Sequence, residues 1–133
     1  MSNKKFTILI VDDNSGFISR MKIILDEVAN FTHIHTATNH DEAYELFNQI
    51  RPDLVMLDIR LPGKSGLSLL KKINDSSFKC RVIMNSNYTN DHYRQESMEL
   101  GAAYFLDKTN DFEIVPQLIR EIAVDTLQRV KQN

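Results

Sequence analysis

The sequence predicts an α/β fold in which helices cover both faces of a mainly parallel five-stranded sheet. Five short runs of β-branched and aliphatic residues alternate along the chain with five longer amphipathic segments. Most of these short runs are continuously apolar, as in strands that are buried on both faces. Strands separated by helices form βαβ units, whose crossovers are almost always right-handed. The pattern therefore indicates a doubly wound arrangement.

Each expected strand is a short apolar run that ends at a polar or turn-forming residue. The first run stops abruptly at two aspartates, and the second alternates, which suits a strand with one less buried face. The other three are short and rich in aliphatic residues. The expected strands are residues 6–11, 32–37, 54–57, 81–84 and 102–106.

The expected helices are marked by apolar residues three and four positions apart and by their end signals. Asn39 is a suitable N-cap for the second helix, and Pro52 ends it. Gly101 closes the fourth helix, the most polar of the five. The last begins near Asp111, provided that Pro116 falls in its first turn. The expected helices are residues 17–28, 40–50, 67–73, 91–100 and about 111–127.

Length and composition favour a single soluble domain, residues 1–133 with a core of about 6–127 and no output domain. A net charge of −2 gives no electrostatic reason to expect binding to nucleic acid or an anionic membrane. No apolar run approaches the roughly 20 residues that span a bilayer, and the first residues do not resemble a signal peptide. The lone Cys80 excludes an intrachain disulfide and suits a reducing cytoplasm.

Polar side chains that could bind a ligand or take part in a reaction follow four of the expected strands. Asp12 and Asp13 follow the first strand, Asp58 the third, Ser86 the fourth and Lys108 the fifth. In an open parallel sheet, function gathers outside the carboxyl ends of the strands. Each residue alone has an ordinary explanation, as a turn, a helix cap or a solvated charge. Their joint occurrence at four strand ends favours a functional site.

The chemistry of this set indicates phosphoryl transfer. Three clustered carboxylates raise one another's pKa unless a cation compensates them, and oxygen ligands with incomplete coordination suit Mg²⁺ (or Mn²⁺). Lys108 and Ser86 can meet phosphoryl oxygens. A carboxylate at the centre, Asp58, can then attack phosphorus in line.

These residues lie in segments that resemble the receiver (response-regulator) domain of two-component signalling. The resemblance covers nearly the whole chain and implies a flavodoxin-like (βα)5 three-layer sandwich with strand order 2-1-3-4-5. The four motifs together are far more specific than any one of them. The matching segments are residues 8–13, 53–66, 82–86 and 101–108.

The resemblance implies a role for each site residue. Asp58 would accept the phosphoryl group from a sensor histidine kinase or a histidine phosphotransfer protein. Asp13, Asp58 and the backbone carbonyl of Arg60 would bind Mg²⁺ directly, with Asp12 acting through metal-bound water. Lys108 and Ser86 would hold the phosphoryl oxygens.

The resemblance also implies a switch. Phe105, rather than its neighbour Tyr104, would turn inward as Ser86 moves toward the phosphate. The face formed by the fourth helix, fifth strand and fifth helix would then control binding to another protein, whose identity the sequence does not give. We expect a monomer or weak dimer.

Several positions depart from the family's pattern. The family usually has proline after the lysine, where this chain has Thr109, and a small residue where it has Asn87. Asn85 interrupts an otherwise apolar strand. Arg60 and Tyr88 occupy positions that tune dephosphorylation in the family, so we expect them to set the lifetime of the phosphoryl group.

Three alternative interpretations compete with a stand-alone receiver. A magnesium-dependent phosphohydrolase that forms an aspartyl phosphate needs a second acid two residues beyond its nucleophile, where this chain has Arg60. A flavin- or nucleotide-binding domain needs a glycine-rich phosphate loop after the first strand, where Asp12 and Asp13 would repel an anion. The chain could also be a receiver fragment cut from a longer transcriptional regulator.

Overall fold

The computed structural model describes residues 5–28, 32–87 and 90–132 and contains one sheet of five parallel strands. The strand order is β2-β1-β3-β4-β5, so the flavodoxin-like order expected from the resemblance is confirmed. The strands are β1 (Phe6–Val11), β2 (Thr32–Ala37), β3 (Leu54–Leu57), β4 (Arg81–Ser86) and β5 (Tyr104–Asp107).

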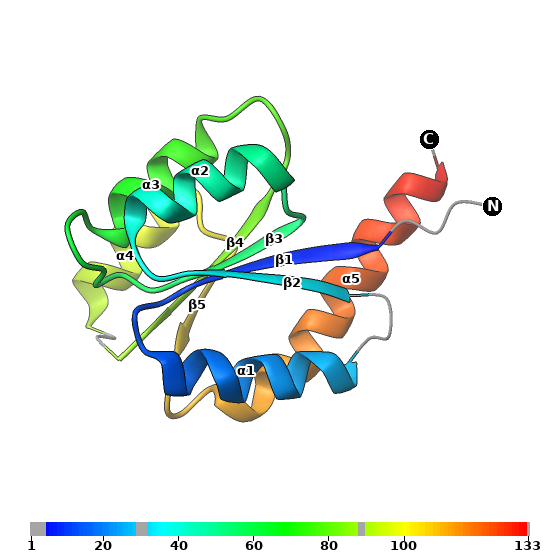
Figure 1. The fold of residues 1–133 in the computed structure, drawn as a ribbon, viewed down its shortest axis with the longest axis horizontal. Coiled ribbons are helices and arrows are strands. Elements are labelled where there is room, and N and C mark those ends of the chain that lie inside the picture. Colours follow the sequence, from blue (N-terminus) through cyan, green and yellow to red (C-terminus); the bar gives the residue numbers. More distant parts are fainter. Residues whose placement is uncertain (1–4, 29–31, 88–89, 133) are drawn as a thin grey trace.

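Helices cover both faces of this sheet (Figure 1). One layer consists of α1 and α5, and the other of α2, α3 and α4. A 3₁₀ turn, η1 (Phe112–Ile114), leads into the last helix. The helices are α1 (Ser15–Val28), α2 (His40–Ile50), α3 (Gly66–Asn74), α4 (Asp91–Glu99) and α5 (Val115–Gln132). None of the helices in the described segments is long and apolar enough to cross a membrane.

The central strand β1 is apolar on both faces, because each face meets a separate core. Ile8 and Ile10 pack into the cluster under α1 and α5, with residues such as Met21 and Ile119. Leu9, between them, points to the opposite cluster under α2 and α3. This two-sided burial explains why the strand reads as a continuous apolar run.

The ends of α2 follow the signals in the sequence. The Asn39 side chain accepts a hydrogen bond from the Glu42 amide, which confirms Asn39 as the N-cap. Arg51, directly before Pro52, adopts a left-handed conformation with φ of 46° and donates its amide to the carbonyl of Phe47. The proline stops the helix because the preceding residue is disfavoured in the α region.

The fifth strand was expected to begin at Ala102, but β5 begins at Tyr104. Ala102 instead closes α4: its amide bonds the carbonyl of Ser97 while the amide of Gly101 bonds that of Met98. These two bonds, with Gly101 at φ of 102°, form a Schellman motif. The residues before β5 are thus used as a helix cap.

Other boundaries also differ from expectation, among them the start of α5 and the end of β4. The helix expected to start near Asp111 starts at Val115, because the 3₁₀ turn occupies the residues before it, and Pro116 does lie in the first turn. Strand β4 continues two residues beyond Met84, since Asn85 and Ser86 pair with β5. A polar residue at 85 therefore does not interrupt the strand.

Gly66 begins α3 in close contact with the backbone that carries Asp58. Its amide donates to the carbonyl of Ile59, with 2.7 Å between nitrogen and oxygen. A Cβ atom at this position would lie 1.9 Å from the carbonyl oxygen of Asp58. Only glycine permits this approach, so the start of α3 is fixed against the end of β3.

Gly66→Ala should lower the free energy of unfolding by about 1–3 kcal/mol, because the new methyl group must displace backbone. Urea unfolding followed by circular dichroism measures the change. Gly16→Ala is the matched control, since its Cβ would meet only a side-chain atom of Asn14, at 3.3 Å, and its effect should stay within about 1 kcal/mol. Equal stability of the Gly66 variant and the wild type would contradict the tight contact.

Candidate functional site

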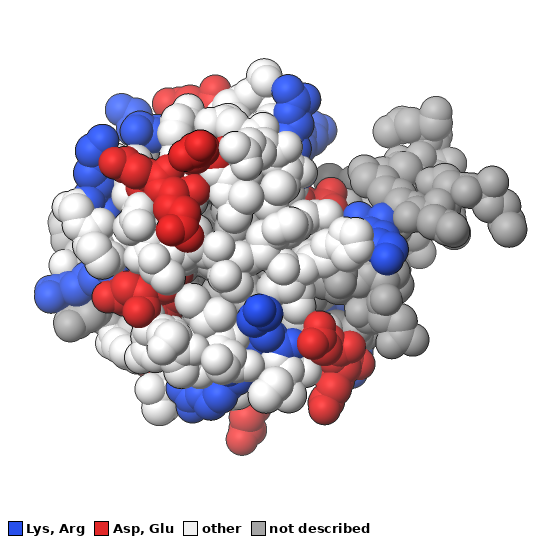
Figure 2. Space-filling view, viewed as in Figure 1, with Lys and Arg blue, Asp and Glu red and all other residues white. Residues whose placement is uncertain are grey.

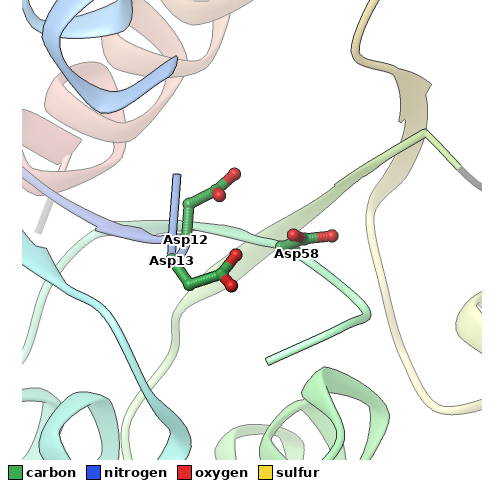
Figure 3. A group of neighbouring side chains, drawn as sticks. All are labelled: Asp12, Asp13 and Asp58. Carbon is green, nitrogen blue, oxygen red and sulfur yellow. The ribbon is translucent and has the colours of Figure 1, made fainter. Parts of the chain in front are cut away.

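The register of the central strands brings three carboxylates together. Val11 pairs with Leu57, and the ladder continues with a hydrogen bond from the Asp58 amide to the Val11 carbonyl, 3.0 Å long. The side chains that follow these strands therefore share one edge of the sheet, as Figure 3 shows. Carboxylate oxygens of Asp12, Asp13 and Asp58 all lie within 4.8 Å of one another.

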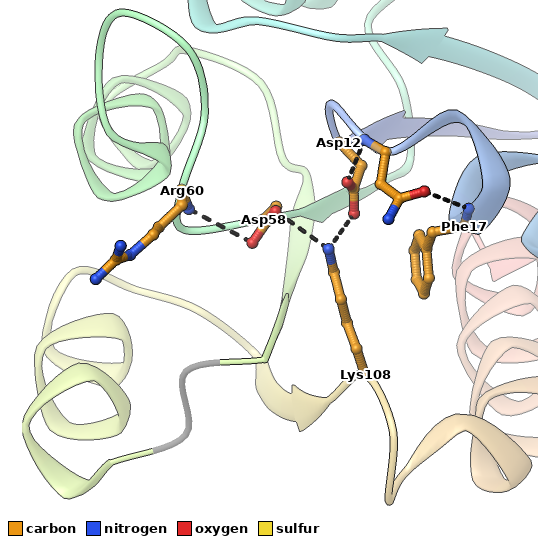
Figure 4. Close-up of polar contacts among 6 residues, drawn as sticks. Asp12, Phe17, Asp58, Arg60 and Lys108 are labelled. Carbon is orange, nitrogen blue, oxygen red and sulfur yellow. Dashed lines mark hydrogen bonds and ion pairs between the residues drawn. The ribbon is translucent and has the colours of Figure 1, made fainter.

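Lys108 inserts between two of these acids (Figure 4). Its Nζ lies 2.6 Å from Oδ2 of Asp12 and 3.1 Å from Oδ2 of Asp58. Its side chain is only 9% exposed and lies over the ring of Phe17, with Nζ 4.8 Å from the ring centroid. The ammonium group thus neutralises part of the carboxylate charge in a largely buried place.

Burial and charge oppose each other in the ionisation of this cluster. Burial raises the pKa of the Asp58 carboxyl above its ordinary value; the charge of Lys108 acts to lower it and that of Asp12 to raise it. Burial acts to lower the pKa of Lys108, but hydrogen bonds and charges from Asp12 and Asp58 outweigh it, so the pKa is raised. The lysine is therefore charged, and the site retains excess negative charge.

Backbone groups orient the two buried carboxylates. Oδ1 of Asp12 accepts a hydrogen bond from the amide of Asn14 at 2.9 Å, and the side chain of Asn14 in turn caps α1 by accepting from the amide of Phe17. Oδ1 of Asp58 accepts from the amide of Arg60 at 3.4 Å. The start of α1 and the loop after β3 thus position the acids.

The three carboxylates fit a hard divalent cation. Asp12 and Asp58 are buried and Asp13 is exposed, so the cluster opens to solvent on one side. Three oxygen donors so close together, with a single lysine to balance them, suit Mg²⁺, which keeps several waters.

The expected switch residues lie on the adjoining strands. Ser86 is fully buried at the end of β4. Phe105 is 5% exposed in the cluster between the sheet and α2, α3 and α4, whereas Tyr104 points outward at 39%. The guanidinium of Arg94 in α4 lies over the Phe105 ring at 4.9 Å and donates to the Phe105 carbonyl at 3.4 Å. The inward aromatic is therefore covered by α4.

The expected tuning positions are only partly visible. Arg60 lines an open groove beside the site, together with Leu61 of the same loop and Tyr93 of α4. Asn87 is exposed at the end of β4. Tyr88 lies outside the described residues. The role of Arg60 and Tyr88 in setting the phosphoryl lifetime stays a prediction.

Sequence reasoning missed the residues that hold the loop after β5. Thr109 stands where the family usually has proline, and the described residues contain no cis peptide bond. The carboxylate of Asp107 instead accepts the amides of Thr109 and Asn110, at 2.8 and 3.0 Å. Aspartate side chains often accept a hydrogen bond from the backbone amide two residues later, in an Asx-turn. This preference could have identified the contact from the sequence. The long-range contacts of Arg94 and Phe17 left no such signal.

The face of the molecule seen in Figure 2 carries mixed charge. Its lysine and arginine side chains are scattered over the face, with acidic side chains among them. Among the described residues on that face, no extended positive surface of the kind that attracts nucleic acid is present.

Comparisons with known proteins agree with this geometry. Residues 8–120 match the response regulator receiver domain family. The chain is 36% identical to sporulation initiation phosphotransferase F of Bacillus subtilis over 123 residues, covering 91% of this chain and 94% of that protein. It is 35% identical to a protein-glutamate methylesterase/protein-glutamine glutaminase of Idiomarina loihiensis, of which it covers 31%.

A solved structure has the same fold. The signal receiver domain of a DNA binding response regulator from Colwellia psychrerythraea 34H superposes with a TM-score of 0.84 at 26% identity. The match covers 89% of this chain and 98% of that domain.

Asp58→Asn should stabilise the metal-free protein, by about 1 kcal/mol at neutral pH, because it removes one ionised group from a desolvated acidic cluster. The folded state raises the pKa of Asp58. The gain should therefore be absent below the ordinary aspartate range, near pH 4, and complete above the raised pKa. Thermal unfolding in EDTA across pH measures it.

Mg²⁺ should reverse this order by binding the wild type more tightly than the variant. Asp26→Asn, which removes an exposed acid at the far end of α1, should show neither effect. A less stable Asp58 variant in EDTA would mean that the ion pair with Lys108 outweighs the repulsion.

Proposed function

This chain belongs to the response regulator receiver domain family, and we propose from that membership that it accepts a phosphoryl group on Asp58. The donor is a phosphohistidine of a sensor histidine kinase or of a histidine phosphotransfer protein. The observation that carries the proposal is the position of Asp58: it follows β3, lies beside two further carboxylates, and has Oδ2 3.1 Å from Nζ of Lys108. Partners of this class have cytoplasmic kinase or transfer domains, so we place the reaction in the cytoplasm.

The chemistry is an in-line displacement at phosphorus. A carboxylate oxygen of Asp58 forms the new P–O bond as the P–N bond to the donor imidazole breaks. The imidazole nitrogen leaves with the electron pair and takes up a proton from solvent. Lys108 and Ser86 stabilise the charge that spreads over the equatorial oxygens. The fixed orientation of Asp58 by the Arg60 amide reduces the entropic cost of attack.

Asp13, Asp58 and the backbone carbonyl of Arg60 would bind the metal directly, and Asp12 would act through metal-bound water. Support comes from the carboxylate oxygens of the three acids, which lie within 4.8 Å of one another. A bound Mg²⁺ supplies charge neutralisation for the incoming phosphoryl group. Asp12 and Asp58 already share the Lys108 ammonium. The lysine holds these two acids close together.

The output of the phosphorylated chain is binding to another protein. The new group adds about −1.5 to −2 charges, and Ser86 moves toward it, which changes the space next to Phe105. Phe105 and Arg94 connect this change to the face formed by α4, β5 and α5. Likeness over 94% of a relative named as a phosphotransferase supports a phosphorelay intermediate. The phosphohydrolase alternative lacks support, since Arg60 occupies the position of the required acid.

Incubation with acetyl phosphate and Mg²⁺ should add one phosphoryl group to the wild type and none to Asp58→Asn. Intact-mass spectrometry and mapping of the modified peptide measure the product. Asp26→Asn is the control that removes an acid elsewhere and should be modified normally. Modification that survives in the Asp58 variant would overturn the assignment of the acceptor.

The pair Arg60 and Tyr88 should set the lifetime of the phosphoryl group by shaping the path of attacking water. Replacing Arg60→Asn and Tyr88→Glu together should change the decay rate severalfold, as measured by loss of phosphorylated mass after the donor is removed. Lys64→Asn, an exposed change in the same loop as Arg60, should leave the rate unchanged. An unaltered rate in the double variant would rule out the tuning role.

A further inference from the structure

The loop that carries Lys108 is closed by the carboxylate of Asp107. Oδ1 of Asp107 accepts hydrogen bonds from the amides of both Thr109 and Asn110, at 2.8 and 3.0 Å. Oδ2 accepts a third bond from the side-chain amide of Asn110 at 3.2 Å. These bonds lower the pKa of the Asp107 carboxyl, the amides of Asn110 and Thr109 being the main causes. The carboxylate is thus ionised and bound to the two residues that follow Lys108.

A second carboxylate closes the same loop from the other side. Oδ2 of Asp111 accepts the amide of Asp107 at 2.8 Å, and the amide of Asp111 donates to the carbonyl of Asp107 at 3.0 Å. The amide of Lys108 itself bonds the carbonyl of Ser86 at 3.1 Å, as a continuation of the sheet. The described hydrogen bonds that join residues 107–111 to one another therefore all involve Asp107, the residue before Lys108.

This arrangement fixes the direction in which the lysine side chain leaves the backbone. A lysine has four rotatable side-chain bonds, and ordering it costs conformational entropy. Lys108 nevertheless reaches Asp12 and Asp58 along a single path over the Phe17 ring. If the backbone at residue 108 were also mobile, placing the ammonium group would cost still more conformational entropy. Thr109 does not restrict the backbone as proline would, so the restriction has to come from hydrogen bonds.

We propose that Asp107 is a positioning residue, which holds the loop after β5 so that the ammonium group of Lys108 is fixed at the acceptor aspartate. The proposal rests on the phosphoryl-acceptor function of Asp58. Asp107 acts through Lys108 and does not touch the reacting atoms. It performs this task with hydrogen bonds from its carboxylate to backbone amides, and its negative charge is not the essential property.

Three variants separate geometry from charge. Asp107→Ala removes all three acceptor bonds. Asp107→Asn keeps an Oδ1 atom that can accept the same two backbone amides, but carries no charge. Asn110→Ala removes only the side-chain bond. Two quantities are measured for each folded variant: the rate of phosphorylation by acetyl phosphate at saturating Mg²⁺, and the ¹H–¹⁵N signal of the Lys108 ammonium group without Mg²⁺.

Asp107→Ala should slow phosphorylation about tenfold, because a displaced charge no longer meets the transition state, and should broaden or abolish the Lys108 signal. Asp107→Asn and Asn110→Ala should stay close to wild type in both measurements. An Asp107→Asn variant as slow as Asp107→Ala would overturn the proposal, since charge would then be the operative property. So would an Asp107→Ala variant with wild-type rate and signal.

Failure of the proposal can be told apart from failure of the proposed function. If the wild type is not phosphorylated, the function assigned to Asp58 is wrong, but the ammonium signal still reports where Lys108 lies. A sharp signal that persists in Asp107→Ala would then overturn the positioning role. Loss of the signal in Asp107→Ala with retention in Asp107→Asn would support it.

Discussion

The hydrogen bond from the amide of Asp58 to the carbonyl of Val11 extends the ladder between β1 and β3 by one step beyond the strands. On the other side of β1, the amide of Asp12 makes the same kind of step to the carbonyl of Ala37 in β2. The register of β1 against β2 and β3 therefore determines where the segments after these strands leave the sheet. Its apolar residues meet a core on each face, so a slip of one residue would exchange both cores. The site inherits its geometry from that register.

The charge of the site is a second constraint, and it acts against stability. Lys108 pairs with the two buried carboxylates, and the exposed carboxylate of Asp13 lies close to both. Burial disfavours the ionised form of Asp58, which is the form that the proposed function requires. Surrounding contacts hold the acids in place despite this cost. They are the close approach of Gly66 to the Asp58 carbonyl, the N-cap at Asn14, and the hydrogen bonds of the loop after β5. Functional sites commonly store such costs.

Local signals predicted most of the fold, and contacts between distant residues account for what they missed. Apolar runs and the cap at Asn39 located the strands and the second helix, while the strand order came from the family resemblance. The start of β5 was misplaced because the amide of Ala102 bonds the carbonyl of Ser97 in the preceding helix and not the neighbouring strand. The pattern of apolar residues does not distinguish these two kinds of partner. The rule that functional residues gather at the carboxyl ends of parallel strands predicted that Asp12, Asp58 and Lys108 lie at one edge of the sheet. It did not predict the ion pairs between them.

The contact between Arg94 and Phe105 makes the placement of α4 sensitive to ionic strength. Ser97 is the only buried residue in the fully described, nine-residue α4, so apolar burial contributes little to holding this helix. The placement of α4 therefore depends more on the contacts of Arg94 with Phe105. These are the cation–π contact with the ring and the hydrogen bond to the carbonyl. Electrostatic contacts near a surface weaken as salt screens them. Added salt should therefore weaken the contacts that hold α4 more than those that hold the sheet beneath it.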